Sequence, residues 1–594
     1  MQVNNLSQIL FRSYLEIPEH VSIILQSSGQ PDRSITYREL FLASAGYAQK
    51  LAEAGIGKGE VVILILNHGE DLIYSFFGAI LNGVLPSIMP FLTEKLSPDH
   101  YRSSLISLLK ITTPATIITY PDFASEIQQA CQGTSVRSIL VSNQINRQTI
   151  RNELTDLDEL KGLTLSPAEI VLLQHSSGST GLQKGIALSH QAILNQLESY
   201  SQALRLNSTD VIVSWLPLYH DMGLIAGYIL PILERVPLVL MSPFDWVRAP
   251  FRLLQSIARY RGTLCWLPNF AYNFCTQKIR DKDLVDVDLS CLRAVINCSE
   301  PIYYLSHKMF LERFQPYGLR PEALATSYAM AENVFAVTQG GIDGPVSVDV
   351  IDRQALMHHQ IAKPIDKDLA DLTAAKEVGD LDSSDAIKMV SSGSPIAGTH
   401  LKVINSQGVD LPERHIGEIA LHSNCMLTGY FNRPDLTEKA FSDGWYLTGD
   451  LGYLANGEVF ITGRKKDLII VGGKNIYPQD LEQLAGEVKG VHPGRVVAFG
   501  VFNEQNGTED VVIIAESDLP EENMPVIASH VANDINRIAI EIRDRVTRNS
   551  DIALRYVHIV GKNWLIKTSS GKIARSANRD KYLSEFAQWG GYNF

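Results

Sequence analysis

Short apolar runs that alternate with helical patterns are the sequence feature that most constrains this fold. Between residues 36 and 141, helical spacing of apolar residues precedes runs such as Val61–Leu66, and glycine or proline marks the breaks. Further apolar runs follow at 87–91, 115–119 and 138–141. Strands separated by helices are typical of a largely parallel sheet that is buried on both faces. The sequence therefore predicts an α/β fold.

The length of the chain predicts more than one folding unit. Its 594 residues, 45% of them hydrophobic and 20% charged, indicate a globular protein with several cores. Shorter, β-rich segments from Leu401 onward predict a small β subdomain, and the region after it is long enough for its own α+β unit. The stretch 340–389, rich in Asp, Lys and Ala and weakly periodic, is expected to be an inserted element or an exposed lobe.

The overall charge and the absence of targeting patterns exclude several classes of protein. A net charge of -13 argues against a general affinity for nucleic acid or anionic membranes. The most apolar segments, 72–89 and 224–241, are broken by glycine, proline or charge, so we expect no membrane span and no secretory signal. The six cysteines lack metal-ligand spacing. We therefore expect a cytoplasmic protein without disulfides or structural zinc.

The loop Ser176–Gly185, with the sequence SSGSTGLQKG, combines glycines, hydroxyls and one lysine. Glycine lets backbone N–H groups approach an anion, hydroxyls add donors and Lys184 adds a point charge, so the loop suits phosphate. It is not a Walker loop, because Gly185 follows the lysine and a helix N-cap comes only at Ser189. Taken alone, the same loop also fits a mobile surface turn.

Two further features remain open on the residues alone. His220 and Asp221 follow a predicted strand at 211–216, where open α/β sheets bind ligands, but a hydrogen-bonded histidine at a domain seam fits equally well. The segment from Glu541 to Tyr582 contains ten basic and four acidic residues, which gives it a local charge of +6. Such a run indicates either a solvated basic face or a local site for an acidic partner.

Five motifs, taken in order, resemble the motif set of the adenylate-forming enzymes, which include acyl-CoA synthetases, peptide-synthetase adenylation domains and luciferases. The motifs are SSGSTGLQKG (176–185), YAMAE (328–332), GWYLTGDLGYL (444–454), GRKKDLIIVGGKNIYP (463–478) and KTSSGKIAR (567–575). The resemblance implies a large N-terminal domain, 1–465, of two α/β subdomains and a small distorted β-barrel at about 395–463. A small mobile α+β domain, 466–594, would follow, with its hinge at Lys466.

The resemblance also implies roles in ATP chemistry. Thr180 and Lys184 would bind the β- and γ-phosphates and the departing pyrophosphate, and Glu332 with Thr180 would hold Mg²⁺ through oxygen ligands. Lys572 would bridge the substrate carboxylate and the α-phosphate as negative charge builds. In isolation, Glu332 could equally be a surface acid and Lys572 one more cation of the basic segment.

The nucleoside and the acyl group have implied partners too. Asp450 would accept hydrogen bonds from the ribose hydroxyls, and Arg464 would support the ribose. Tyr328 would flank adenine. In isolation, Asp450 could equally be a turn residue. The implied ATP- and AMP-binding residues are Ser176, Ser177, Gly178, Ser179, Thr180, Gly181, Lys184, Ser299, Glu300, Ser327, Tyr328, Ala329, Met330, Asp450, Ile461, Arg464 and Lys572. The implied substrate pocket comprises His220, Asp221, Met222, Gly223 and Cys298.

Three segments resemble the fatty acyl-AMP ligase branch: LPLYHDMGL (216–224), YAMAENVFAVTQG (328–340) and the insertion at 340–389, which in that branch restrains the C-terminal domain. This implies activation of a long-chain fatty acid by ATP and Mg²⁺, then transfer to the phosphopantetheine thiol of a holo acyl carrier protein or carrier domain. A long-chain acyl-CoA synthetase and an inactive acyl or nucleotide sensor are the alternatives.

Two details of the resemblance carry physical consequences. Ala329 stands where the branch usually has glycine, so the turn is strained if that position needs positive φ. Because carrier proteins are acidic, the basic segment would dock them, with Arg575 and Arg579 in the docking face.

Overall fold

A seven-stranded sheet forms the centre of the molecule. The computed structural model describes residues 4–90, 98–145, 160–175, 184–365, 370–371, 386–471, 474–503, 508–517, 530–550, 554–568 and 571–585. The sheet order is β13-β12-β11-β9-β10-β1-β2, parallel except for β2. Its strands are β1 (Val21–Gln26), β2 (Arg33–Thr36), β9 (Ile212–Ser214), β10 (Leu238–Met241), β11 (Leu264–Leu267), β12 (Ala294–Cys298) and β13 (Leu324–Ser327).

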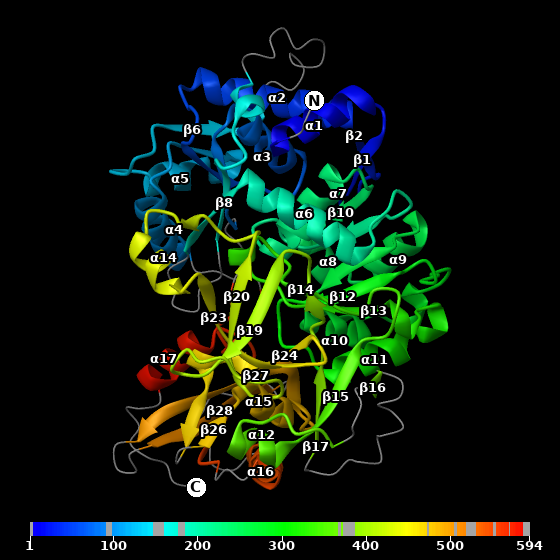
Figure 1. The fold of residues 1–594 in the computed structure, drawn as a ribbon, viewed down its shortest axis with the longest axis vertical. Helices are drawn as coiled ribbons and strands as arrows, with labels where there is room; N and C mark the ends of the chain where they lie inside the picture. The colour runs from blue at the N-terminus through cyan, green and yellow to red at the C-terminus, as the bar shows by residue number, and fades with distance from the viewer. Residues whose placement is uncertain are drawn as a thin grey trace.

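A second, fully parallel sheet has the order β4-β3-β5-β6. Its strands are β3 (Val61–Ile65), β4 (Leu85–Ile88), β5 (Thr116–Thr119) and β6 (Ser138–Val141). Helices α2 (Tyr37–Glu53) and α3 (Glu70–Asn82) pack so closely at Gly78 that only glycine fits there. A Cβ at this position would lie 2.5 Å from the Cβ of Tyr47. The predicted alternation of apolar strands and helices is confirmed, and Figure 1 shows these layers in blue and green in the upper part of the molecule.

Further helices connect and flank the strands of both sheets. Ser189 caps α6 as predicted, since its side chain accepts a hydrogen bond from the N–H of Ala192. The principal helices of this region are α1 (Leu6–Glu16), α4 (Pro98–Thr112), α5 (Ala124–Ala130), α6 (His190–Leu204), α7 (Leu230–Leu233), α8 (Pro243–Arg248), α9 (Phe251–Tyr260), α10 (Asn269–Lys278) and α11 (Tyr304–Phe314). A π-helix occupies Met222–Ile229.

The β-rich region that follows is antiparallel. Its main sheet has the order β19-β20-β23-β22, with β24 paired to β23. The strands are β19 (Thr399–Ile404), β20 (Gly417–Ser423), β22 (Phe441–Ser442), β23 (Trp445–Ala455) and β24 (Glu458–Arg464). A small sheet of β7 (Ile170–His175), β8 (Gly185–Ser189) and β21 (Gly429–Tyr430) joins this region to the α/β part, and the short helix α14 (Pro434–Ala440) follows it.

The stretch expected to be an insertion contains a small antiparallel sheet of β15 (Ser347–Asp352), β16 (Ala370–Asp371) and β17 (Ala386–Val390), with α12 (Arg353–His359) after β15. The described part packs against the β-rich region. Arg414 Nη1 donates to Asp349 Oδ2 at 2.9 Å, and the hydroxyl of Tyr453 donates to the same oxygen at 2.8 Å. Residues 366–369 and 372–385 lie outside the described residues.

The C-terminal region has apolar cores of its own, one of them extending from Ile469 to Leu554. Ile538, Ile542 and Val546 of α16 are buried in this core. Figure 1 shows the region at the bottom, in orange and red. Its elements are β25 (Ile469–Val471), β26 (Lys474–Ile476), α15 (Pro478–Gly486), β27 (Val491–Asn503), β28 (Thr508–Ser517), α16 (His530–Ser550), β29 (Tyr556–Val560) and α17 (Arg575–Glu585).

The expectation that Arg575 belongs to an exposed docking face is wrong. Its guanidinium lies 2.8 Å from Glu482 Oε1 and 2.5 Å from Asp467 Oδ2, and only 16% of the side chain is exposed. Arg575 therefore ties α17 to α15 and to the segment that precedes β25.

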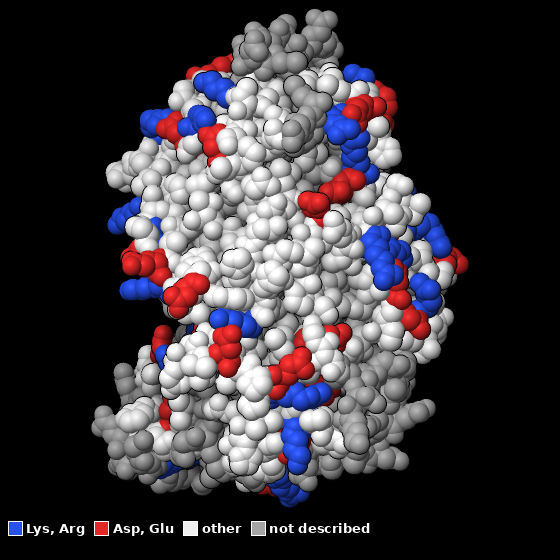
Figure 2. Space-filling model, viewed as in Figure 1, with Lys and Arg blue, Asp and Glu red and all other residues white. Residues whose placement is uncertain are grey.

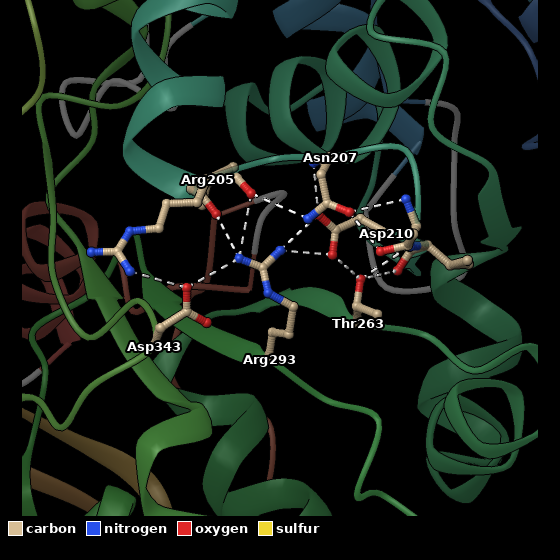
Figure 3. Close-up of polar contacts among 9 residues, drawn as sticks. Arg205, Asn207, Asp210, Thr263, Arg293 and Asp343 are labelled. Carbon is tan, nitrogen blue, oxygen red and sulfur yellow. Dashed lines mark hydrogen bonds and ion pairs between the residues drawn. The ribbon is translucent and has the colours of Figure 1, made fainter.

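A polar network joins the amino ends of the central strands (Figure 3). Arg293 Nη1 lies 2.8 and 2.7 Å from the two carboxylate oxygens of Asp210, whose side chain is fully buried. Thr263 donates to Asp210 at 2.7 Å, and Arg293 also contacts Asp343 at 3.4 Å. Asp210, Thr263 and Arg293 precede β9, β11 and β12, so the network lies at the edge of the sheet opposite to the carboxyl ends of the strands.

Charged residues of both signs and free thiols are found in the described part of the chain. Figure 2 shows basic and acidic residues interspersed on the face that it presents. All six cysteines are free. Within the described ranges, the helices are too short or too polar to cross a bilayer.

Candidate active site

Asp450 and Arg464 lie opposite each other on β23 and β24. Arg464 Nε donates to Asp450 Oδ1 at 3.0 Å, and the Tyr328 hydroxyl donates to Oδ2 at 2.6 Å. The Asp450 charge raises the pKa of Arg464. Each carboxylate oxygen keeps a second acceptor site, so an oriented, charged carboxylate can still bind a pair of hydroxyls.

The turn after β13 holds Glu332. Ala329 pairs in an isolated β-bridge with Ala336 and lacks positive φ, so the strain anticipated there does not occur. The strain lies instead at Val334, with φ 62° and ψ −56°, where the N–H of Phe335 donates to the carbonyl of Asn333 at 2.6 Å. This tight turn fixes the backbone directly after Glu332.

Glu332 and Lys184 approach the same tyrosine. The hydroxyl of Tyr430 donates to Glu332 Oε1 at 3.0 Å, and Lys184 Nζ lies 4.7 Å from the centroid of the Tyr430 ring. Desolvation raises the pKa of Glu332 despite its hydrogen bonds. A carboxylate offers about four acceptor sites and is a preferred Mg²⁺ ligand, so Glu332 fits a cation held together with phosphates.

The residues predicted for the substrate pocket lie at or after the carboxyl ends of β9 and β12. His220 Nδ1 lies 2.6 Å from Asp221 Oδ1, which also accepts from the N–H of Met222. Burial acts to raise the pKa of Asp221, but the charges of His220 and Lys572 lower it overall. A Cβ on Gly223 would lie 2.2 Å from the carbonyl oxygen of Pro217, so only glycine fits.

The end of β12 and the turn after it contain three further predicted residues. Burial raises the pKa of Cys298 to about 12, so this thiol is neutral. Ser299 adopts φ 69°, and its hydroxyl lies 3.6 Å from the Cys298 sulfur and 3.9 Å from that of Met222. Glu300 accepts a hydrogen bond from the N–H of Phe270 at 2.8 Å.

Lys572 reaches this site from the C-terminal region. The N–H of Thr568 donates to the Lys572 carbonyl at 2.7 Å. Burial lowers the pKa of Lys572, and the charges of Glu300 and Asp221 oppose that shift. The C-terminal lysine therefore lies within electrostatic reach of carboxylates at the ends of β9 and β12.

Not every predicted residue is placed at the site. Ser176, Ser177, Gly178, Ser179, Thr180 and Gly181 lie outside the described residues. The Ser327 hydroxyl donates to the carbonyl of Thr338 at 2.8 Å, and the N–H of Met330 donates to the carbonyl of Phe335. Ile461 lies on β24, opposite Gly452. Desolvation lowers the pKa of Lys466, and the charge of Arg464 adds to this shift.

The sequence reading missed Tyr430 and Tyr446, whose hydroxyl oxygens lie 3.0 Å apart. Tyr430 lies outside the five motifs, and Tyr446 lies inside GWYLTGDLGYL (444–454) but was given no role. Only the pairing of β21 with β8 brings Tyr430 to Lys184.

Comparisons with known proteins agree on the class of protein. Residues 15–431 match the family described as AMP-binding enzyme. The medium-chain-fatty-acid–[acyl-carrier-protein] ligase JamA of Moorena producens is 29% identical over 98% of this chain and 95% of its own length. The long-chain-fatty-acid–AMP ligase FadD26 of Mycobacterium bovis is 28% identical over 93% and 92%. A structure from work on fatty acyl-adenylate ligases of E. coli and L. pneumophila superposes with a TM-score of 0.85 at 24% identity, covering 99% of both chains.

Proposed function

Because the chain belongs to the AMP-binding enzyme family, we propose that it activates a long-chain fatty acid with ATP and transfers the acyl group to the phosphopantetheine thiol of an acyl carrier protein. The names of the two relatives support the fatty acid, and that of JamA supports the carrier protein. The observation that carries the proposal is that Lys572, from the C-terminal region, lies within electrostatic reach of the strand-end carboxylates Asp221 and Glu300, whose charges act on its pKa.

The first half-reaction joins the fatty carboxylate to the α-phosphorus and releases pyrophosphate. A carboxylate is a poor electrophile, and the mixed anhydride with AMP supplies a good leaving group. Catalysis requires alignment of the carboxylate oxygen with phosphorus and neutralisation of the growing negative charge. Little acid–base chemistry is needed, which suits a site built mainly from fixed charges.

We assign these tasks to particular side chains. Lys572 stabilises charge between the carboxylate and the α-phosphate, while Lys184 holds the outer phosphates. Asp450, oriented by Arg464, accepts from the ribose hydroxyls. Glu332, with Thr180, would hold Mg²⁺, which when bound neutralises phosphate charge.

The second half-reaction requires Lys572 to give way to the incoming thiol. We propose that residues 466–594 rotate about Lys466, which lies in the short 3-10 turn Lys465–Asp467 between β24 and β25. The separate core from Ile469 onward supports this division. The glycines at 472–473, which would then face the site, lie outside the described residues.

The carrier protein would dock on basic residues that remain exposed. The side chains of Arg548 and Arg579 are 79% and 46% exposed, unlike that of Arg575. Arg548→Glu and Arg579→Glu test this docking face by charge reversal. Unchanged transfer to the carrier protein in both variants would contradict docking on this face.

The free thiols also support a cytoplasmic location.

The test incubates the pure protein with ATP, Mg²⁺ and a labelled acid from a C8 to C18 series, alone, with CoA, or with holo carrier protein. We expect acyl-AMP and pyrophosphate in every arm, best with C12 to C18 acids, and acyl transfer to the carrier protein. Rapid acyl-CoA formation would identify an acyl-CoA synthetase instead. Binding of ATP without any acyl-AMP would identify a sensor.

A further inference from the structure

Tyr430 connects two charged groups that come from distant parts of the chain. Its hydroxyl lies 3.0 Å from Glu332 Oε1, and the ammonium of Lys184 lies 4.7 Å from its ring centroid. A cation over an aromatic face is attracted by the ring quadrupole. One side chain thus contacts both the carboxylate proposed for the metal and the lysine proposed for the phosphates.

The backbone around Tyr430 is anchored to the same two segments. Strand β8 begins directly after Lys184, and Tyr430 pairs with Ile186 of this strand. The N–H of Phe431 donates to the carbonyl of Gly185 at 2.7 Å. On the other side, the N–H of Leu427 donates to the carbonyl of Glu332 at 2.8 Å. The backbone from Leu427 to Phe431 therefore joins the segment of Glu332 to the start of β8.

The hydrogen bonds around Tyr430 have a defined direction. An ionised Glu332 can only accept, so Tyr430 gives it its single hydroxyl proton. The hydroxyl of Tyr446, 3.0 Å away, must then donate to the oxygen of Tyr430. Tyr430 is 6% exposed, so these hydrogen bonds lie in the protein interior.

We propose that Tyr430 is a positioning residue of the phosphate site. Its hydroxyl orients the carboxylate of Glu332 toward the cation, and its ring holds Lys184 beside that carboxylate before the triphosphate arrives. Both charged groups are thereby arranged in advance, so less of the binding free energy is lost in ordering them. The inference rests on the proposed function, because it assumes that this site binds ATP with a divalent cation.

Calorimetric titration of ATP, with Mg²⁺ or with EDTA, tests the hydroxyl. Tyr430→Phe keeps the ring and removes only the donor to Glu332. We expect it to reduce the Mg²⁺-dependent gain in ATP affinity by about tenfold, because a hydrogen bond to a charged group is lost. The affinity in EDTA should stay within twofold of wild type.

Tyr453→Phe is the matched control, because it also removes a buried hydroxyl that donates to a carboxylate, at Asp349, away from this site. Its Mg²⁺-dependent gain should equal that of wild type. Tyr430→Leu, which loses the ring as well, should weaken ATP binding in EDTA too, by about threefold or more.

Two results would overturn the inference: a Tyr430→Phe variant that behaves like Tyr453→Phe, or an equal loss of affinity with Mg²⁺ and with EDTA. Circular dichroism and a melting curve show whether each variant is folded. Wild-type protein that binds no ATP in either buffer would instead contradict the proposed function.

Discussion

Lys572 enters the site as a desolvated cation, and its environment explains how it can act there. Burial lowers its pKa, whereas Glu300 and Asp221 favour the charged form. A lysine that is less firmly protonated than usual is held next to the place where negative charge would develop. The residue is thus sensitive to pH in a way that an exposed lysine is not.

The rate of adenylation should fall as pH rises through the lowered pKa of Lys572. Above that pKa the amine is neutral and cannot stabilise the phosphate charge, and below it the full effect is present. The measurement is a pH profile of acyl-AMP formation in single turnover. Lys572→Arg, which stays charged, should react more slowly but lose the alkaline decline. An identical alkaline limb in both proteins would assign the titration to another group.

Lys184→Ala should slow adenylation by about 100-fold, a typical cost of removing one charge-stabilising group. Acyl transfer from supplied acyl-AMP should stay near the wild-type rate, since no pyrophosphate leaves in that step. Both half-reactions are followed with labelled acid. Equal losses in the two would mean that Lys184 acts on the acyl-adenylate itself or on the fold.

At the level of the elements, the two edges of the central sheet have different tasks. The carboxyl ends of β9 and β12 carry Asp221 and Cys298, while the amino ends of β9, β11 and β12 are joined by the Asp210 network (Figure 3). The proposed ligand chemistry at one edge would thus be separated from structural ion pairing at the other.

Asp210→Ala should lower the free energy of unfolding by about 3 kcal/mol or more, because it leaves Arg293 without its buried partner. Asp343→Ala is the control: its carboxylate contacts the same arginine but is 37% exposed, so we expect a change below about 1 kcal/mol. Chemical denaturation of both variants gives the comparison. Equal losses of unfolding free energy in the two variants would show that burial does not determine how much each ion pair stabilises the fold.

The sequence predicted the elements better than the contacts between them. Apolar runs such as Val61–Leu66 correspond closely to strands, because burial on both faces leaves a continuous hydrophobic pattern. The contacts of Tyr430 and the ion pairs of Arg575 arise from pairing across long sequence separations, which periodicity does not encode. For this reason the sequence pattern predicted an exposed basic face that included Arg575, whereas the Arg575 side chain is largely buried in ion pairs.

At the scale of the whole molecule, the C-terminal region closes onto the N-terminal part at more than one place. The charges of Glu300 and Asp221 act on the pKa of Lys572. Tyr477 packs in one apolar cluster with Ile351 and Leu356 of the inserted stretch. Under the proposed function this arrangement suits adenylation, and we expect the two parts to separate before transfer to a thiol.

Lys466→Pro should retain acyl-AMP formation within about threefold but slow transfer to the carrier protein by at least tenfold. Proline fixes φ near −65°, which suits the 3-10 turn at this residue and opposes rotation out of it. Single-turnover assays separate the two steps. Normal transfer by this variant would place the hinge elsewhere.

The central claim, that this chain is a fatty acyl-AMP ligase serving a carrier protein, is tested most directly by the partition of its intermediate. Wild-type protein loaded with labelled acyl-AMP in a single turnover is offered CoA and holo carrier protein together, at equal concentrations. The account predicts that most of the label moves to the carrier protein. Label found chiefly in acyl-CoA would contradict it.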